Sequence, residues 1–241
     1  MTQFRIGCSG FYNRHWKGIF YPDKLPQRLW FDHYAENFNT LELNVTFYKF
    51  PSEAMLNVWY QKSPTDFMFS VKAPRLITHL KKFNDCKSLI DDFYLACSNG
   101  LQEKLGYLLF QLPPSIVYSE EKFMQILSLV NTNFRHVIEF RNETWWRQDV
   151  YDALAQKGIT FCSVSHPKMP DLIIANTDNI YVRNHGVPDM FYSDYSPEKL
   201  QALKNEIELK NVSKAYVYFN NTAGIHGILN AGHFRDLTNL I

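Results

Sequence analysis

The sequence predicts an α/β protein built as a single (β/α)8 barrel of the TIM type. Short apolar runs rich in β-branched and aromatic residues alternate with longer segments whose apolar residues recur about every 3.6 positions. There are eight such runs, and their alternation with helices favours a barrel, with an open doubly wound sheet as the structural alternative. No Gly-rich linker, repeat or low-complexity segment divides the 241 residues, so we expect one domain over 1–241.

The predicted strands are short, and several are apolar on both faces. Runs such as Tyr-Leu-Leu-Phe at 107–110 lack the polar alternation of half-exposed hairpins and suit parallel strands that helices cover. We expect strands at 4–8, 40–44, 67–72, 107–111, 137–141, 160–164, 180–185 and 215–220.

The predicted helices begin at capping residues. Ser119 precedes an apolar stripe at positions 123, 126, 127 and 130, with two glutamates in the first turn. Ser196 precedes Pro197, which fits the first helical position, and Ser88 is expected to open a third helix. Further helices are predicted near 28–37, 52–61, 147–157 and 232–240.

The balance of charge argues against a protein that wraps nucleic acid over many phosphates. The chain carries 25 Lys and Arg against 24 Asp and Glu, a net charge of +1. Extensive contact with nucleic acid or with an anionic membrane surface normally needs a basic excess. Any anion site must therefore be local, and we expect no membrane partner.

The cysteines and the first residues predict a cytoplasmic protein. The four cysteines form no CxxC pair and have no zinc-finger spacing with histidine, as is typical of free thiols in a reducing compartment. The chain begins without the basic and apolar regions of a signal peptide. No apolar run approaches the length that spans a bilayer.

Polar residues end most of the predicted strands. Residues two apart on a strand share a face, and the carboxyl ends of barrel strands converge on the ligand site. Charged side chains buried there are costly unless they are paired or used in function. We therefore expect three pairs of side chains to point into one shared mouth: Glu42 with Asn44, Glu139 with Arg141, and Arg183 with His185.

Further polar side chains at strand ends, and one on the loop after the third strand, are candidates for the same mouth: Lys72, His79, Gln111, Asn220 and Asn221. The structural alternative is a salt-bridge network that closes the barrel, in which Glu42 neutralises Lys72. His185 is consistent with a general acid–base, a ligand for a metal or phosphate, or a hydrogen-bonded structural residue.

Aromatic residues are frequent in the early loops. Tyr12, Trp16 and Tyr48 are candidates for a wall on which a sugar or a base stacks. Packing beneath a long loop is the alternative for most of these rings.

The sequence carries none of the common catalytic motifs. GxSxG, the P-loop, GxGxxG after a strand, HExxH and the EF-hand loop are all absent. This weighs against common hydrolases, NTPases and dehydrogenases, but not against an enzyme assembled from separate strand ends. No cofactor is indicated.

The same residues carry a resemblance to a known family. The segments Ile-Gly-Cys-Ser-Gly-Phe at 6–11, Asn-Thr-Leu-Glu-Leu-Asn-Val-Thr-Phe-Tyr at 39–48, Glu-Phe-Arg at 139–141 and Arg-Asn-His-Gly at 183–186 resemble the YecE-like family, catalogued as domain of unknown function 72. The resemblance runs in order along nearly the whole chain. It implies a TIM barrel distantly similar to xylose isomerase and endonuclease IV, without an established activity. An endonuclease IV-like binding of nucleic acid has been suggested for some members.

The chain departs from that family's pattern at three positions, one of which is Gly227, where members often carry alanine. Phe11 stands where family members usually carry tryptophan, and Asn184 stands where they usually carry an apolar residue. Strand alternation predicts that Asn184 points away from the mouth.

Three functions stay open. The first is an enzyme acting on a phosphorylated or polyhydroxy ligand, whose anionic group Lys72, Arg141 and Arg183 hold. In this hypothesis the catalytic groups are Glu42, Glu139, His185 and Lys72, and the side chains that bond hydroxyl groups are Asn44, Gln111, Asn220 and Asn221. A small anionic molecule is then the expected partner.

The second function is a metal-dependent phosphodiesterase with Glu42, Glu139 and His185 as ligands. Three neighbouring cations would compete with the metal, so none is expected. The third is a non-catalytic module that binds nucleic acid or another protein.

Overall fold

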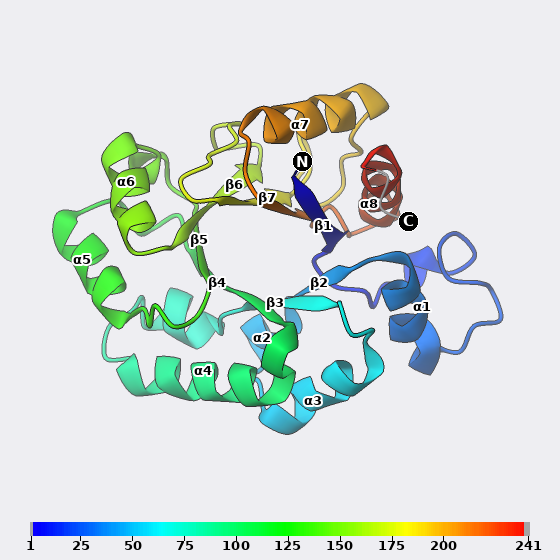
Figure 1. Ribbon diagram of the computed structural model, residues 1–241, viewed down its shortest axis with the longest axis horizontal. Coiled ribbons are helices and arrows are strands. Elements are labelled where there is room, and N and C mark those ends of the chain that lie inside the picture. Colours follow the sequence, from blue (N-terminus) through cyan, green and yellow to red (C-terminus); the bar gives the residue numbers. More distant parts are fainter. Residues whose placement is uncertain (1, 239–241) are drawn as a thin grey trace.

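Parallel strands form a ring at the centre of the molecule. The structure is a computed structural model and describes residues 2–238. The eight strands follow the order β1-β8-β7-β6-β5-β4-β3-β2, so strands that follow one another in the chain also lie side by side. Figure 1 looks onto this ring and shows the helices outside it. The prediction of a (β/α)8 barrel is confirmed, because a doubly wound sheet would reverse its strand order.

Each predicted strand is present, with ends within two residues of the prediction. The strands are β1 Gln3–Cys8, β2 Thr40–Leu43, β3 Met68–Lys72, β4 Leu105–Leu112, β5 His136–Phe140, β6 Thr160–Ser165, β7 Asn179–Asn184 and β8 Lys214–Phe219. Nearly all of their residues are buried, as expected of parallel strands covered on both faces.

Side chains close the ring between β1 and β2. Among the described residues the two strands share no backbone ladder. The Asn39 side chain bonds the β1 backbone, accepting at 2.9 Å and donating at 3.2 Å. The Tyr34 hydroxyl accepts from Cys8 N at 2.7 Å and donates to Thr40 O at 3.0 Å. The strands approach so closely that a Cβ on Gly7 would lie 2.1 Å from Thr40 O.

Helices cover the outside of the ring. They are α1 Trp30–Asn37, α2 Val45–Tyr48, α3 Glu53–Lys62, α4 Lys87–Leu101, α5 Glu120–Leu129, α6 Gln148–Gln156, α7 Pro197–Leu209 and α8 His226–Leu237. The predicted caps Ser119 and Ser196 each accept a hydrogen bond from the backbone N–H three residues later, at 3.2 and 3.3 Å. Among residues 2–238, no helix combines the length and apolar character that crossing a membrane requires.

The sequence misplaced the starts of two helices and missed short ones. α4 begins at Lys87, and Ser88 is not its cap. α8 begins at His226, six residues before the predicted start at 232, because buried apolar residues override the low helix propensity of its glycines. The predicted end at Leu240 lies outside the described residues. Neither α2 nor the π-helix Leu76–Leu80 was predicted.

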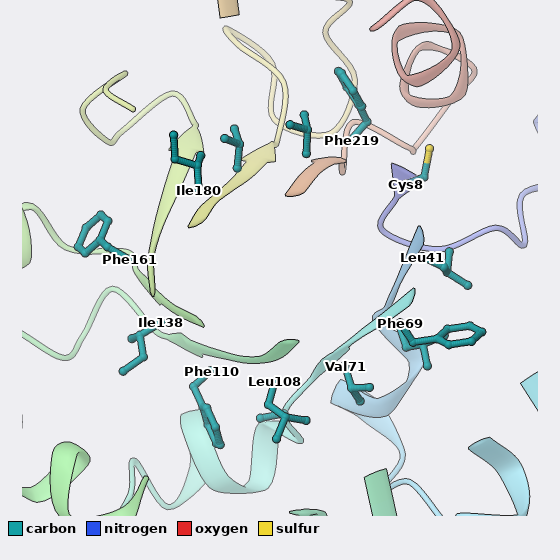
Figure 2. Packing of buried hydrophobic residues seen from close by; sticks show 14 of the residues in the cluster. Cys8, Leu41, Phe69, Val71, Leu108, Phe110, Ile138, Phe161, Ile180 and Phe219 are labelled. Carbon is teal, nitrogen blue, oxygen red and sulfur yellow. The ribbon is translucent and has the colours of Figure 1, made fainter. Parts of the chain in front are cut away.

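Apolar residues pack between the ring and the helices. Figure 2 shows alternate strand residues, among them Leu41, Phe69, Leu108, Ile138 and Phe219, pointing outward from the ring. The other alternate residues therefore fill the barrel.

Four tyrosines pack inside the barrel together with Leu109, Val137, Cys162 and Val164. Tyr107, Tyr181, Tyr216 and Tyr218 are almost fully buried, with ring centroids 4.9 Å apart between Tyr107 and Tyr216 and 5.0 Å apart between Tyr181 and Tyr218. Buried tyrosine hydroxyls need hydrogen-bond partners. The Tyr218 hydroxyl bonds Thr40 and Ser70 within the barrel. The interior is thus a packed core whose tyrosine hydroxyls bond polar side chains of neighbouring strands.

A buried histidine on the outer face makes stability depend on pH. His136 begins β5, is 1% exposed and has its Nε2 3.0 Å from the Tyr94 hydroxyl. Burial lowers the pKa of His136 to about 4, below the value near 6.5 expected in the unfolded chain. As the pH falls, the unfolded chain therefore binds a proton on His136 before the folded protein does. The free energy that His136 contributes to folding is fully present above about pH 6.5 and is lost as the pH falls through about 4.

We expect the His136→Leu variant to be less sensitive to acid than the wild type. Between about pH 7 and pH 5, its free energy of unfolding should fall by about 2 kcal/mol less than that of the wild type. Urea denaturation at the two pH values measures the free energy of unfolding. The control is His15→Leu, which removes an exposed imidazole. Parallel pH profiles for wild type and His136→Leu would contradict the prediction.

Candidate functional site

An arginine and two glutamates form a buried ion-pair network below the barrel mouth. Arg183 of β7 donates through Nε and Nη2 to Glu42 of β2, at 2.9 and 2.6 Å, and through Nη1 to Glu139 of β5. All three side chains are 0% exposed. They come from separate strands because inward-facing residues of a barrel meet at its axis. The structure thus joins Glu42 to Arg183 and not to Lys72.

Hydrogen bonds from two further elements fix the Glu42 carboxylate. Ser9, just after β1, donates its hydroxyl to Oε1 at 2.6 Å. Tyr181 of β7 donates its hydroxyl to Oε2 at 2.7 Å. The carboxylate therefore accepts from Ser9, Tyr181 and Arg183, which is the dense hydrogen bonding that a buried charge requires.

The network continues toward the opening through Arg141 and His185. Arg141 bonds Glu139 through Nε and lies with Nη2 3.0 Å from His185 Nε2. Because a guanidinium can only donate, His185 Nε2 accepts from Arg141, and the Asn220 amide nitrogen lies 2.8 Å from His185 Nδ1. Gly186 follows with a φ of 93°, which lets the chain turn sharply after His185. We call Glu42, Glu139, Arg141, Arg183 and His185 the mouth cluster.

The charges of the mouth cluster set the protonation of its members. Burial alone would raise the pKa of Glu139, but Arg141 and Arg183 outweigh it and hold this pKa well below the usual range. Burial, reinforced by Arg141, lowers the pKa of His185 well below its ordinary value. Glu139 is therefore ionised and His185 neutral near neutral pH.

Lys72, at the end of β3, faces the same mouth. Its Nζ lies 4.1 Å from the centre of the Phe47 ring, and the residue is 9% exposed. Burial, followed by the repulsion of Arg183, lowers the pKa of Lys72 to about 7. His79 packs edge-on against the same Phe47 ring at 4.9 Å, and its Nε2 lies 3.4 Å from the Gln111 amide. Burial lowers the pKa of His79 to about 4, so its ring is neutral at pH 7.

A cavity of about 390 Å³ opens beside the mouth cluster, over the seam between β1 and β2. Tyr12 and Tyr48, 59% and 73% exposed, belong to its wall, and Glu42 belongs to its lining. Asn44 adds a buried Oδ1 that has no hydrogen-bond partner within residues 2–238. An unpaired buried acceptor is unusual, so the cavity offers a hydrogen-bond site to a ligand or to water.

The structure corrects three sequence predictions. Trp16 does not line the mouth: it is fully buried beneath its loop, and its Nε1 donates to Gly224 O at 3.0 Å. Asn221 follows the end of β8 and donates to Ser193 O and Asn230 Oδ1, away from the mouth. Arg183 is enclosed by its two glutamates, so an incoming anion cannot reach its guanidinium.

The remaining predicted residues lie at the mouth or around it. These are Glu42, Glu139, Arg141, His185, Lys72, His79, Gln111, Asn44, Asn220, Tyr12 and Tyr48. Asn184 lines a separate cavity between β7 and α7, as strand alternation predicted.

Sequence reasoning missed four residues of the site: Ser9, Phe47, His166 and Tyr181. His166 follows β6, and its ring centre lies 5.8 Å from that of His185. Residues two apart on a strand share a face, so the series Cys162, Val164, His166 points to His166. The same spacing, counted back from Arg183, points to Tyr181. Ser9 and Phe47 lie outside strands, where periodicity gives no signal.

The three ligands that the phosphodiesterase hypothesis requires do not fit a metal centre. Glu42 and Glu139 face each other across the guanidinium of Arg183, whose positive charge occupies the position that a cation would take. Within residues 2–238, no group of three or more His, Cys, Asp or Glu side chains is arranged to hold a metal ion. The donor set therefore gives no support to the phosphodiesterase hypothesis.

Comparison with solved structures identifies close structural relatives. A DUF72 family protein from Thermotoga maritima is 30% identical with a TM-score of 0.88, covering 98% of this chain and 99% of the relative. A DUF72 family protein from Enterococcus faecalis is 16% identical with a TM-score of 0.83, covering 100% and 99% of the two chains. The second likeness shows the fold alone.

Curated protein sequences and a family model point to the same family as the solved structures. The UPF0759 protein YunF of Bacillus subtilis is 24% identical, covering 85% of this chain and 84% of the relative. The UPF0759 protein YecE of Escherichia coli is 25% identical over 129 residues, and this match spans 47% of the relative, about half its length. Residues 5–240 match the family described as "Protein of unknown function DUF72". The chain is therefore a member of the DUF72 family, to which the YecE-like proteins belong.

Proposed function

We propose that this protein is an enzyme that binds a small anionic, polyhydroxylated molecule at the carboxyl end of its barrel. The observation that carries the proposal is an excess of positive charge in a largely buried mouth. With Lys72 protonated, three cations (Lys72, Arg141 and Arg183) accompany two carboxylates (Glu42 and Glu139), while His185 is neutral. An anion bound there would balance the remaining charge in a site of low dielectric, where the attraction is strong.

Arg141 is the group best placed to hold the anion. Its side chain is 11% exposed, whereas those of Arg183 and both glutamates are 0% exposed. Glu139 and His185 fix the guanidinium from one side, which presets its orientation. A preoriented arginine recognises phosphate or carboxylate through paired hydrogen bonds.

The groups suited to transfer protons are those that are neutral or half-protonated at pH 7. Lys72, with a pKa of about 7, is suited to act as an acid or a base. His185 lies against Arg141, next to the anion site. The oxygens of Glu42 and Glu139 are occupied by hydrogen bonds from Arg183, Arg141, Ser9 and Tyr181. The two glutamates therefore contribute by holding the arginine side chains in position.

The cavity over β1 and β2 supplies the rest of the binding surface. Asn44 Oδ1 has no partner within residues 2–238 and can accept a hydrogen bond from a ligand hydroxyl, with the Asn220 amide beside Asn44. Gln111 adds an amide on the other side of the mouth, next to His79. Tyr12 and Tyr48 provide aromatic faces suited to the apolar side of a sugar ring.

Thermal unfolding with inorganic phosphate, glycerol 3-phosphate and ribose 5-phosphate tests the proposal. At a ligand concentration one hundred times Kd, binding should add about 2.7 kcal/mol of stability and raise the Tm. Arg141→Met should abolish the shift. Arg147→Met removes an exposed arginine paired with Asp149 and should leave it intact. A full shift in Arg141→Met, or no shift by any probe in the wild type, would overturn the proposal.

A further inference from the structure

We propose that Lys72 is a nucleophile that forms an imine with the carbonyl carbon of the bound ligand. The inference deepens the proposed function and rests on it, because the ligand must first be held at the mouth. The substrate class becomes an aldehyde or ketone that carries a carboxylate or phosphate group.

The first argument is the unpaired amine of Lys72. Although Lys72 is 9% exposed, its Nζ has no hydrogen-bond acceptor within residues 2–238 and lies over the face of Phe47. Lys104 offers a comparison in the same chain. It is 6% exposed, lies over Tyr60, and donates to Tyr60 O, Ser63 O and Ser63 Oγ at 2.8, 2.7 and 3.0 Å. A structural lysine is satisfied in this way, and Lys72 is not.

The second argument is the charge around the amine. Lys72 faces Arg183 from β7, Glu139 from β5, Arg141 just after β5, Glu42 from β2, and the neutral His79 from the segment after β3. The glutamates are already paired with the arginines, so burial and Arg183 prevail and the pKa of Lys72 is about 7. About half of the amine is then unprotonated at neutral pH, which is the form that attacks a carbonyl.

The third argument is the position of Lys72 relative to the other groups. Lys72 and His79 contact the same Phe47 ring, so a neutral imidazole stands beside the amine. Arg141 is in the electrostatic environment of both residues. A ligand anchored on Arg141 by its anionic group would present a neighbouring carbonyl toward Lys72.

The chemical step needs no redox partner. The lone pair of Nζ bonds the carbonyl carbon while the carbonyl π electrons move to oxygen. One proton passes from nitrogen to that oxygen, and the product is a carbinolamine. A second proton, taken up from the solvent, allows the oxygen to leave as water, and a protonated imine remains between Lys72 and the ligand. One water is released for each imine formed.

Reductive trapping tests the inference on the full chain. The protein is incubated with glyoxylate, an aldehyde that carries a carboxylate, and with sodium cyanoborohydride, and the adducts are located by peptide mass mapping. An ordinary lysine with a pKa near 10.4 has a neutral fraction roughly 10³-fold smaller at pH 7 than an amine of pKa about 7. We expect Lys72 to be labelled roughly 10²-fold faster than exposed lysines. Lys104, in the same peptide map, should stay unlabelled.

Two variants and a pH series sharpen the test. Lys72→Arg and Lys72→Met should both lose the dominant adduct, with an unchanged circular dichroism spectrum showing that each is folded. The rate of labelling at Lys72 should rise with pH around a midpoint near 7. Labelling spread evenly over the lysines, or none at Lys72, would overturn the inference.

The inference and the proposed function can fail separately. If inorganic phosphate raises the Tm of the wild type and Lys72 is not trapped, imine formation is wrong and anion binding stands. If neither result is obtained, both are wrong.

Discussion

Replacing Arg183 with leucine is expected to lower the free energy of unfolding by about 3–5 kcal/mol. The substitution leaves Glu42 and Glu139 facing each other, fully buried, without the guanidinium that now joins them. Glu139 keeps its ion pair with Arg141, but Glu42 keeps only the hydroxyl groups of Ser9 and Tyr181, and the two buried carboxylates then repel each other with most of their solvation lost. The loss is measured by urea denaturation at pH 7.

A matched variant and a double variant separate this effect from a general loss of charge. Arg147→Leu removes an arginine whose ion pair with Asp149 is about half exposed, and it should change stability by at most about 1 kcal/mol. Adding Glu42→Gln to Arg183→Leu should recover part of the loss, since one uncompensated charge disappears. A destabilisation by Arg183→Leu no larger than that of Arg147→Leu would show that the network does not hold the barrel mouth together.

Gly7→Ala is expected to destabilise the protein by about 3 kcal/mol, the upper end of the usual penalty for overpacking. The added Cβ would lie 2.1 Å from Thr40 O and 2.6 Å from the Tyr34 hydroxyl. Neither atom can yield easily, because the Tyr34 hydroxyl bridges the two strands and Thr40 O belongs to the backbone of β2. The change in urea midpoint measures the effect.

The control for Gly7 has the opposite sign. A Cβ on Gly232, inside α8, would meet no atom within 4 Å. Alanine is favoured over glycine in a helix interior, so Gly232→Ala should raise the free energy of unfolding by up to about 1 kcal/mol. If Gly7→Ala were as stable as the wild type, the two strands would have to lie farther apart than described.

Much of the fold was predictable because one signal repeats along the chain. Apolar runs such as those of β4 and β5 identified the strands, and Ser119 and Ser196 marked helix starts that the structure confirms. Alternation along the strands also placed Glu42, Glu139 and Arg183 on one inner surface without any knowledge of their contacts.

The pairing of those side chains was not predictable. Strand alternation says which face a residue occupies, but neighbours across a barrel depend on strand tilt and stagger, which sequence periodicity does not encode. Strand alternation therefore fits a pairing of Glu42 with Lys72 as well as it fits the pairing with Arg183. The predictions for Trp16 and Asn221 failed for a related reason. The sequence pattern of a loop tryptophan or of an amide at a strand end is the same whether the side chain packs inside the protein or faces a ligand.

The side-chain bridges between β1 and β2 have a consequence for how such a barrel can be adapted. Elsewhere in the ring, a change in strand spacing breaks a backbone ladder, whereas here side-chain hydrogen bonds, above all those of Asn39 and Tyr34, join the two strands. The cavity lined by Tyr12 and Tyr48 lies over this same place. Substitutions at these side chains are thus a route to resizing the cavity without breaking a backbone ladder of the barrel.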